Sequence, residues 1–246
     1  MRKVFIVTGG GGGIGREVAL GICKRGDSPV IIDKDYARAK ETEDLVTGFG
    51  IEGTAYTADL TKADEVKEVF AEIYHDFKSI DGLVNNAGGY FAPISIDEMN
   101  AEIWDMVVDA NLKSAFLCSL EAFHYMKPMR HGKIVNLTST LFLTSGMSLS
   151  PYISAKGGVV GLTRALAVDM GAFNINVNAI APGLTSTDYA YEALGRERFE
   201  IVKQLKAIKK DQTPGDLVGP ILFLLSSDSD SITGQTLIVD GGRAFL

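Results

Sequence analysis

Short apolar runs rich in β-branched residues alternate along the chain with longer amphipathic stretches. Several of these runs are apolar almost throughout, as expected for strands of a parallel sheet that is covered on both faces. The amphipathic stretches between them predict helices. The strands are expected at residues 3–8, 29–33, 53–58, 82–85, 133–138, 174–180 and 235–239.

Alternating strands and helices favour a Rossmann-type α/β fold, in which a doubly wound, seven-stranded parallel sheet carries helices on both faces. A (β/α) barrel suits the same chain length, but it needs eight repeats, and a glycine turn after the first strand is typical of the open sheet. No linker or repeat divides the sequence, so residues 1–246 are expected to form one domain. The mostly polar segment 185–214 breaks the alternation and is expected to be a lid over the substrate.

Composition narrows the class of function. The formal net charge of -7 would repel phosphate backbones and acidic lipid headgroups, so we expect no nucleic-acid or membrane partner. The two cysteines, Cys23 and Cys118, lie far apart and suggest neither a disulfide framework nor a metal site. No secretory segment precedes the first strand, and no apolar run approaches the roughly 20 residues of a membrane span. A cytoplasmic enzyme acting on a small molecule fits these features.

A run of five glycines follows the first predicted strand and leads into a helix-forming stretch at residues 16–25. Backbone N–H groups at the start of a helix, unobstructed by side chains, can approach a pyrophosphate closely, and the helix dipole favours its charge. The placement between strand and helix therefore predicts a dinucleotide site. Two sets of glycines fit a fingerprint spacing, either Gly10, Gly12 and Gly15 or Gly9, Gly13 and Gly15.

Asp33 ends the second predicted strand and bears on the choice of cofactor. Its carboxylate can accept hydrogen bonds from the hydroxyls of an adenosine ribose, and it would repel a 2′-phosphate. Lys34 follows directly and could partly accommodate such a phosphate, so NAD is expected and NADP stays an alternative. Asp59 and Leu60, after the third strand, could face the adenine.

Tyr152 and Lys156 are four residues apart, on one face of a helix that Pro151 can begin. A free tyrosine is protonated at neutral pH, whereas a neighbouring ammonium favours the phenolate. The pair can therefore take a proton from an alcohol. Taken alone, however, the same spacing also fits an exposed helix face.

Further motifs surround this pair. They are Thr8-Gly9-x-x-x-Gly13-x-Gly15, Asn85-Asn86-Ala87-Gly88, Asn111, Ser139, Tyr152-x-x-x-Lys156 and Pro182-Gly183. In this order and spacing they resemble the common branch of the short-chain dehydrogenase/reductase family, and the resemblance runs on to Asp240-Gly241-Gly242. It implies an NAD(P)-dependent alcohol dehydrogenase or ketoreductase, and it selects the set Gly9, Gly13 and Gly15.

The resemblance also implies a role for each residue. Tyr152 would be the acid/base, Lys156 would hold the nicotinamide ribose and lower the tyrosine pKa, and Ser139 would bind the substrate oxygen. Asn111 would complete a tetrad by holding a water that links Lys156 to bulk solvent. The cofactor contacts would be Gly9, Gly13, Ile14, Gly15, Asp33, Asp59, Leu60, Asn86, Ala87, Gly88, Tyr152, Lys156, Pro182, Gly183 and Thr187, the last on the nicotinamide carboxamide. Ile14 fits a helix-core role equally well.

The residues expected to line the substrate pocket are mostly apolar, with few fixed charges to grip a carboxylate or phosphate. They are Gly89, Tyr90, Phe91, Leu141, Phe142, Leu143, Met147, Leu184, Tyr189 and Tyr191. The first expectation is therefore a hydrophobic secondary alcohol, with cyclic and aromatic alcohols as candidates.

Two rival functions remain open. A 3-oxoacyl-carrier-protein reductase shares every catalytic residue, prefers NADPH and needs a basic docking surface, for which Lys127 and Arg130 are candidates. A dinucleotide-binding sensor or scaffold without turnover is the rival from another class, and the complete set of Asn111, Ser139, Tyr152 and Lys156 argues against it. The family resemblance further implies a homotetramer or homodimer, with residues 243–246 at an interface.

Overall fold

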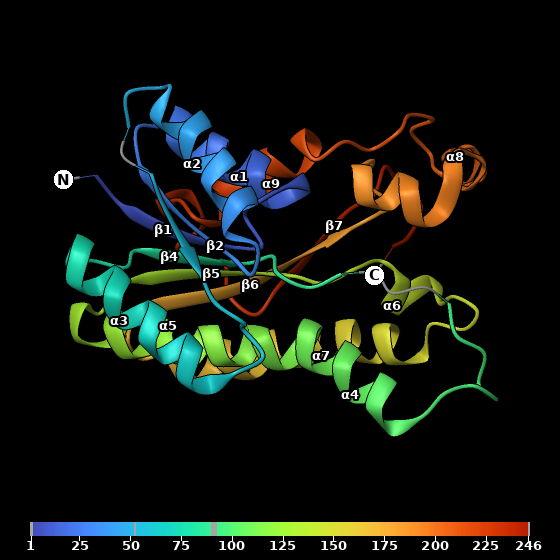
Figure 1. Ribbon diagram of the computed structural model, residues 1–246, viewed down its shortest axis with the longest axis horizontal. Coiled ribbons are helices and arrows are strands. Elements are labelled where there is room, and N and C mark those ends of the chain that lie inside the picture. The colour runs from blue at the N-terminus through green and yellow to red at the C-terminus, as the bar shows by residue number, and fades with distance from the viewer. Residues whose placement is uncertain (1, 52, 90–92, 246) are drawn as a thin grey trace.

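The computed structural model describes residues 2–51, 53–89 and 93–245. Its strands form one parallel sheet of seven, in the order β3-β2-β1-β4-β5-β6-β7, which confirms the predicted fold (Figure 1). The strands are β1 Val4–Thr8, β2 Ser28–Asp33, β3 Thr54–Thr57, β4 Gly82–Asn85, β5 Gly132–Leu137, β6 Ile175–Pro182 and β7 Thr236–Val239.

Helices cover both faces of this sheet. One layer holds α1 and α9 with α2 beside them, and the other holds α3, α4, α5 and α7 (Figure 1). None of the helices in the described residues combines the length and apolar composition needed to span a bilayer. The longer helices are α1 Gly13–Lys24, α2 Tyr36–Thr47, α3 Ala63–Phe77, α4 Ala101–Val108, α5 Ser114–Met129, α7 Ser150–Gly171, α8 Asp188–Leu205 and α9 Gly215–Leu224, and the short ones are α6 Leu141–Thr144, a π-helix Asp109–Lys113 and a 3₁₀-helix Ser227–Ser229.

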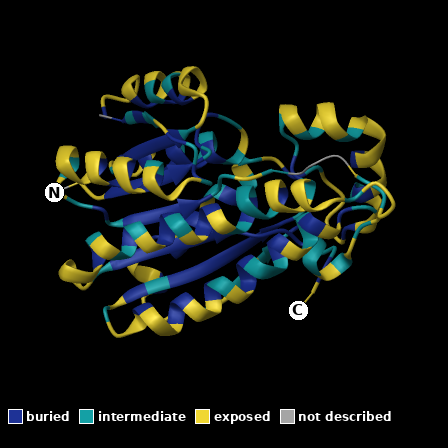
Figure 2. Ribbon diagram, turned by 60° about the horizontal axis from the view of Figure 1, so that its bottom comes forward, coloured by how far each residue is buried: buried dark blue, intermediate teal, exposed yellow. Residues whose placement is uncertain are grey.

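The middle of the sheet is completely buried. Every residue of β1, β4 and β5 is buried, and the strands form the dark centre of Figure 2 beneath helices whose outer faces are exposed. Because both faces of these strands pack against helices, their sequences are mostly apolar on both sides of the pleat. This explains why apolar runs rather than alternation mark the strands in the sequence.

The predicted strand positions differ from the structure by one or two residues at several ends. The sixth strand begins at Ile175 rather than at residue 174, because Asn174 has a φ of 56° that belongs to a turn. It also continues beyond residue 180 to Pro182, which pairs with Val239 as the last residue of the strand. A proline is tolerated there because a strand end needs no further N–H donor.

The ends of three helices follow local sequence signals. Pro151 lies in the first turn of α7, where a missing N–H costs no intrahelical hydrogen bond. The Asp35 carboxylate accepts from the Arg38 N–H at the start of α2, and the Thr187 hydroxyl accepts from the Ala190 N–H at the start of α8. Side-chain caps of this kind fix where a helix begins.

The segment expected to be a lid follows β6, and its two ends pair with each other outside the sheet. Thr185 pairs with Gln212 in an isolated parallel bridge, and the Ser186 N–H donates to the Gln212 carbonyl at 2.7 Å. Between these points lies α8, which is kinked at Gly195, whose φ is 69°. The kink divides α8 into two parts.

A buried chain of polar side chains joins β4 and β5 to the helices beneath them. The Asn85 side-chain amide donates to Asn136 Oδ1 at 2.8 Å and to Ser119 Oγ at 2.9 Å. Asn136 in turn donates to Thr163 Oγ1 on α7 at 2.9 Å. All four residues are fully buried or nearly so, and buried polar groups of this kind need hydrogen-bond partners within the protein.

Asn136→Ala should lower the free energy of unfolding by about 3 kcal/mol, because it leaves the Asn85 amide and the Thr163 hydroxyl short of a partner in the core. Urea denaturation followed by circular dichroism measures this change. Glu68→Ala, at an exposed position on α3, is the control and should stay within about 0.5 kcal/mol of the wild type. Equal stability of the two variants would contradict the proposed contribution of the network.

Candidate active site

A cleft of ≈ 1760 Å³ runs along the carboxyl ends of the strands. It is lined by residues that follow β1, β3, β4, β5 and β6 and by residues of α8. The chain fills the sheet outward from β1 to β3 on one side and then from β4 to β7 on the other, so the strand order reverses between β1 and β4. Ligands of open α/β sheets bind at such a reversal.

The glycine turn between β1 and α1 forms one wall of the cleft. Gly9 and Gly13 have φ values of 62° and 51°, in the left-handed region that favours glycine. Gly15 is buried, and a β-carbon there would collide with the Gly9 carbonyl oxygen and lie 2.6 Å from the Asn86 side-chain nitrogen. This arrangement agrees with the set Gly9, Gly13 and Gly15, of which Gly15 serves close packing rather than direct lining of the cleft.

The Asn86-Ala87-Gly88 turn after β4 is fastened to that glycine turn. The Thr8 hydroxyl accepts from the backbone N–H groups of Asn86 and Ala87, both at 3.0 Å. The Asn86 side chain donates to the carbonyls of Thr8 and Gly9, again at 3.0 Å. The two turns therefore form one rigid wall, and Asn86, Ala87 and Gly88 all line the cleft.

Asn111 is buried in the π-helix between α4 and α5 and does not itself line the cleft. Its side chain holds the turn at Gly89: Oδ1 accepts from the Gly89 N–H at 3.1 Å, and Nδ2 donates to the Gly89 carbonyl at 3.2 Å and to the Val107 carbonyl at 3.0 Å. The helical segment packs against α7, where a β-carbon on Gly158 would lie 2.7 Å from Leu112. Asn111 thus links the cleft wall to the helix that carries Tyr152.

Asp33 is the last residue of β2 and lines the cleft. One carboxylate oxygen accepts from the Gly11 N–H at 3.0 Å, and the other from the Asp35 N–H at 3.1 Å. Asp59 and Leu60 line the cleft nearby, and hydrogen bonds from Thr61 lower the pKa of the Asp59 carboxyl. Leu60 is mostly buried in the core beneath.

Tyr152 and Lys156 lie one turn apart on α7, and both line the cleft. The Lys156 ammonium is 5.8 Å from the centroid of the Tyr152 ring and donates to the Leu137 carbonyl at 2.9 Å. Lys156 is 5% exposed, and this burial lowers its pKa to about 8. The Thr138 hydroxyl donates to the Lys156 carbonyl, which fixes α7 against the end of β5.

Ser139 follows β5 and lines the same cleft. Its hydroxyl oxygen accepts from the Leu141 N–H at 3.3 Å, so the hydroxyl hydrogen can still be donated to a ligand. The structure therefore brings Ser139, Tyr152 and Lys156 together around one space, as the sequence predicted.

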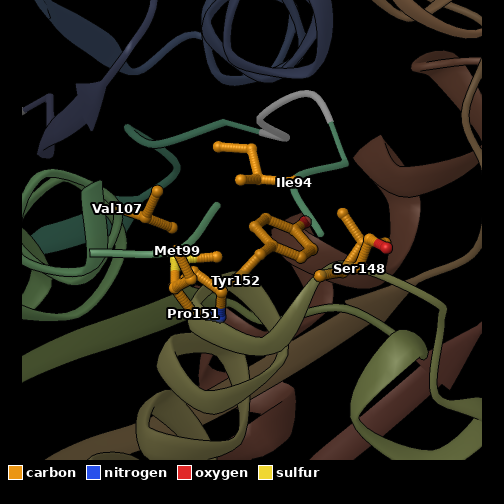
Figure 3. Close-up of a pocket in the computed structure, with 7 residues that line it drawn as sticks. Ile94, Met99, Val107, Ser148, Pro151 and Tyr152 are labelled. Carbon is orange, nitrogen blue, oxygen red and sulfur yellow. The ribbon is translucent and has the colours of Figure 1, made fainter. Parts of the chain in front are cut away.

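One side of the Tyr152 ring faces a small, mainly apolar recess of ≈ 10 Å³ (Figure 3). Ile94, Met99 and Val107 surround the ring in this view, and the Ile94 N–H donates to the Ser148 carbonyl at 2.9 Å. Contacts of this kind restrict the ring while leaving Tyr152 on the wall of the larger cleft.

Four predicted pocket residues, Leu141, Met147, Leu184 and Tyr189, line the cleft together with Gly89. Phe142, Leu143 and Tyr191 do not line it, and Tyr191 instead stacks on Phe199 with ring centroids 4.2 Å apart. Tyr90 and Phe91 lie outside the described residues. Pro182, Gly183 and Thr187 line the cleft as expected, and Ile14 does so while also packing against the core.

Comparison with known proteins agrees with this geometry. A family model described as enoyl-(acyl carrier protein) reductase matches residues 10–244. The chain belongs to the short-chain dehydrogenase/reductase family. It is an oxidoreductase of the kind that acts on CH–OH or keto groups.

Relatives with several named activities match nearly the full length of this oxidoreductase. The (2S)-[(R)-hydroxy(phenyl)methyl]succinyl-CoA dehydrogenase subunit BbsD of Thauera aromatica is 35% identical, over 99% of this chain and 97% of its own. The 2-dehydro-3-deoxy-D-gluconate 5-dehydrogenase of Escherichia coli K12 is 37% identical, over 98% and 94%. The 3-oxoacyl-[acyl-carrier-protein] reductase FabG of Staphylococcus epidermidis is 34% identical, over 98% and 99%.

Solved structures of the family agree with the fold. An NAD⁺-bound xylitol dehydrogenase superimposes with a TM-score of 0.92 at 27% identity, over 98% of both chains. A levodione reductase superimposes with a TM-score of 0.94 at 28% identity, over 98% of this chain and 97% of its own. The named activities differ among these proteins, so the family alone does not define the substrate.

Four arginines that the motifs do not include also line the cleft of this oxidoreductase: Arg16, Arg38, Arg198 and Arg243. The expectation of few fixed charges in the pocket is therefore wrong at the end near α8. Leu194, Arg198 and Val202 all face the cleft at intervals of four, a helical pattern that could have revealed Arg198. Nothing in the local sequence marks Arg38 or Arg243, because their positions depend on tertiary structure.

The buried amine of Lys156 predicts a pH-dependent stability. Its lowered pKa means that the folded protein binds fewer protons than the unfolded chain between about pH 8 and the ordinary lysine value of 10.5. The free energy of unfolding should therefore rise with pH across this window. Relative to Lys156→Met, the wild type should gain on the order of 3 kcal/mol, as measured by urea denaturation at a series of pH values.

The control for this measurement is Lys67→Met, which changes an exposed lysine on α3. Its stability difference from the wild type should not follow pH in this way. A difference between the wild type and Lys156→Met that stays constant from pH 7 to pH 10 would contradict the effect of burial.

Proposed function

We propose that this protein is an NAD(H)-dependent oxidoreductase that interconverts a secondary alcohol and its ketone, with Tyr152 as the acid/base. The observation that carries the proposal is the meeting of Tyr152, Lys156 and Ser139 on one cleft that also includes the glycine turn. The buried Lys156 amine beside the Tyr152 ring is the arrangement that makes a tyrosine useful in proton transfer.

The cleft has the chemistry needed to hold a dinucleotide. The first turn of α1 offers backbone N–H groups without an acidic side chain, and Gly12 at its N-cap has no side chain of its own. At the middle of the cleft, Gly89 has free space where a β-carbon would be. We assign the adenosine end to Gly9, Gly13, Ile14, Gly15, Asp33, Asp59 and Leu60, and the nicotinamide end to Asn86, Ala87, Gly88, Tyr152, Lys156, Pro182, Gly183 and Thr187.

In the oxidative direction, Tyr152 as phenolate accepts the hydroxyl proton of the substrate. Ser139 donates a hydrogen bond to the substrate oxygen, and this bond strengthens as charge develops there. Lys156 supplies positive charge beside Tyr152, and Asn111 acts through the turn at Gly89 and the helix packed on α7. When bound, the nicotinamide accepts or supplies the hydride.

Asn111 is also proposed to hold a water that relays protons from Lys156 to solvent. The π-helix that contains Asn111 packs on α7 close to Lys156, which supports such a relay. Its side-chain oxygen and nitrogen already bond to backbone groups, so the water would have to bind chiefly to other groups of this helix.

The substrate space near Tyr152 is apolar on the side formed by Leu141, Met147 and Leu184. This supports a hydrophobic carbon skeleton around the reacting carbon, and cyclic or aromatic alcohols fit it. We propose that segment 185–214, which contains α8 and is closed at its base by Thr185 and Gln212, acts as the lid. Residues 1–246 would then form one catalytic domain.

The choice of NAD rests on Asp33, whose carboxylate lies against the glycine turn where the adenosine ribose would bind. Arg38 opposes this choice, because its guanidinium is so close to Gly12 that a β-carbon there would collide with it. Arg16 is less available, since it is paired with Glu41 at 2.8 Å and donates to the Gly11 carbonyl. Arg38 and Lys34 could together attract a 2′-phosphate.

Arg38 is therefore the observation that favours the second candidate function, an NADPH-dependent 3-oxoacyl-carrier-protein reductase. The FabG relative of Staphylococcus epidermidis is a 3-oxoacyl-[acyl-carrier-protein] reductase. Lys127 and Arg130 support it less. Both precede β5 and lie close to Phe173, at the amino ends of the strands, whereas the cleft lies at their carboxyl ends. A carrier protein bound there would not face Tyr152.

We also propose that the protein works in the cytoplasm as a homotetramer or homodimer. The two cysteines are free and buried, in line with a reducing compartment. Phe245, near the chain end, is 80% exposed, which suits an interface between subunits. Size-exclusion chromatography with light scattering should therefore give the mass of a dimer or tetramer.

Tyr152→Phe should lower kcat for alcohol oxidation by roughly a thousandfold, because it removes the only group of the pair that can take the hydroxyl proton. NADH binding, measured by fluorescence titration, should change little. Tyr191→Phe is the matched control, since Tyr191 stacks on Phe199 away from the cleft. Full turnover by Tyr152→Phe would refute the mechanism.

Asp33→Asn should reduce the preference for NAD over NADP by roughly tenfold or more, because the amide keeps an acceptor for the Gly11 N–H but no longer repels a 2′-phosphate. Steady-state kcat/KM with each cofactor measures this preference. Arg38→Gln should act in the opposite direction by weakening NADP use. A wild-type enzyme that prefers NADPH would overturn the NAD assignment and favour the reductase.

A further inference from the structure

Arg198 and Arg243 form a pair of cations at the end of the cleft near α8. Arg198 projects from α8, Arg243 follows β7, and both line the cleft. Within residues 2–51, 53–89 and 93–245, neither guanidinium forms a hydrogen bond or a salt bridge. A half-buried guanidinium without a partner, such as that of Arg243, is costly to keep unless an anion binds it.

Backbone hydrogen bonds connect the lid segment, which carries Arg198, to the turn before Arg243. The Ala207 N–H donates to the Gly242 carbonyl at 3.1 Å, and the Ile208 N–H donates to the Gly241 carbonyl at 2.8 Å. These bonds tie the end of the lid to the turn directly before Arg243. Burial first, and then the charge of Arg198, lower the pKa of Arg243, so the two side chains share one electrostatic environment.

Against the lowering by burial and by Arg198, the charge of Asp240 raises the pKa of Arg243, but in the described residues Asp240 forms no salt bridge with either arginine. Asp240 is 3% exposed, and its two oxygens accept from the backbone N–H groups of Gly242, Arg243 and Ala244 at 2.8 to 3.1 Å. Asp240 thus shapes the turn that presents Arg243 rather than pairing with its guanidinium. Asp188, at the start of α8, also lines the cleft but forms no salt bridge with either arginine in the described residues.

The arginine pair belongs to the same wall as the reaction centre. A β-carbon on Gly183 would lie 2.8 Å from Asp240, so the end of β6 packs on the turn that carries Arg243. The Pro182 carbonyl accepts from the Thr140 N–H at 3.0 Å, and Thr140 is adjacent to Ser139. A substrate held by Ser139 and Tyr152 can therefore extend past Leu184 toward the two arginines.

We infer that Arg198 and Arg243 clamp a carboxylate of the substrate, which is then a hydroxy acid in one direction and an oxo acid in the other. The planar guanidinium fork matches a carboxylate in two-point hydrogen bonding, and two forks can hold both of its oxygens. The apolar surface of Leu141, Met147 and Leu184 would contact the carbon chain between the two polar ends. This inference deepens the proposed function and rests on it for the reaction at the other end.

Turnover of matched substrates tests the clamp. The probes are 4-oxopentanoate and 5-oxohexanoate, each compared with its primary amide in NADH oxidation. The wild type should reduce the better acid with a kcat/KM at least roughly tenfold above that of its amide, because only the acid can form charge-assisted hydrogen bonds. Arg198→Gln and Arg243→Gln should lose this preference and reduce the amides as well as the wild type does.

Arg196→Gln is the matched control for these variants. Arg196 lies on the same helix, its guanidinium is 5.8 Å from the Tyr191 ring, and it does not line the cleft. Its preference for the acids should equal that of the wild type. Equal kcat/KM values for acids and amides in the wild type would overturn the clamp. An equal loss of kcat/KM for acids and for amides in the Arg198 and Arg243 variants would overturn it as well.

Binding of glutarate separates the clamp from the reaction. Isothermal titration calorimetry should show glutarate binding to the wild type at least roughly tenfold more tightly than glutaramide, with the difference lost in Arg198→Gln and Arg243→Gln but kept in Arg196→Gln. If this result holds while no ketone is reduced, the clamp stands and the proposed function fails. Equal binding of glutarate by all variants would refute the clamp. Displacement of bound glutarate by inorganic phosphate at a lower concentration than by acetate would also refute it.

Discussion

The close contact between the glycine turn and the turn after β4 holds the site together. The hydroxyl of Thr8, at the end of β1, accepts hydrogen bonds from two backbone N–H groups of the neighbouring turn. The Asn86 side-chain amide donates to the Thr8 and Gly9 carbonyls. These bonds span the point where the order of the strands reverses. The wall that the two turns form together depends on these bonds, because a shift of either turn would change the width of the cleft.

A second constraint is the burial of polar groups beneath the cleft. The chain from Asn85 through Asn136 to Thr163 connects β4 and β5 to α7, the helix of Tyr152 and Lys156. The Thr138 hydroxyl adds a bond from the end of β5 to the Lys156 carbonyl. Buried hydrogen bonds have few alternative partners, so they define one position of α7 relative to the sheet. The separation of Ser139 from Tyr152 follows from that position.

The sequence predicted the parts of this protein that depend on local pattern. Buried parallel strands are apolar runs, the glycine turn lies between a strand and a helix, and Pro151 marks the start of α7. The ends of the strands were predicted less accurately, as Asn174 and Pro182 show, because they depend on turn conformation and on pairing with other strands. Arg38 and Arg243 could not be assigned from sequence, since residues distant along the chain decide which space their guanidinium groups reach.

The hydrogen bond between Asp33 and the Gly11 N–H has a consequence for how cofactor preference can evolve in this protein. The proposed ribose contact also helps to hold the backbone of the turn proposed to bind the pyrophosphate. Replacing Asp33 by a residue without an acceptor would therefore alter recognition at both places in one step. A change of nucleotide preference through this position therefore needs either a new side chain that still accepts from the Gly11 N–H, as asparagine can, or a new partner for that amide.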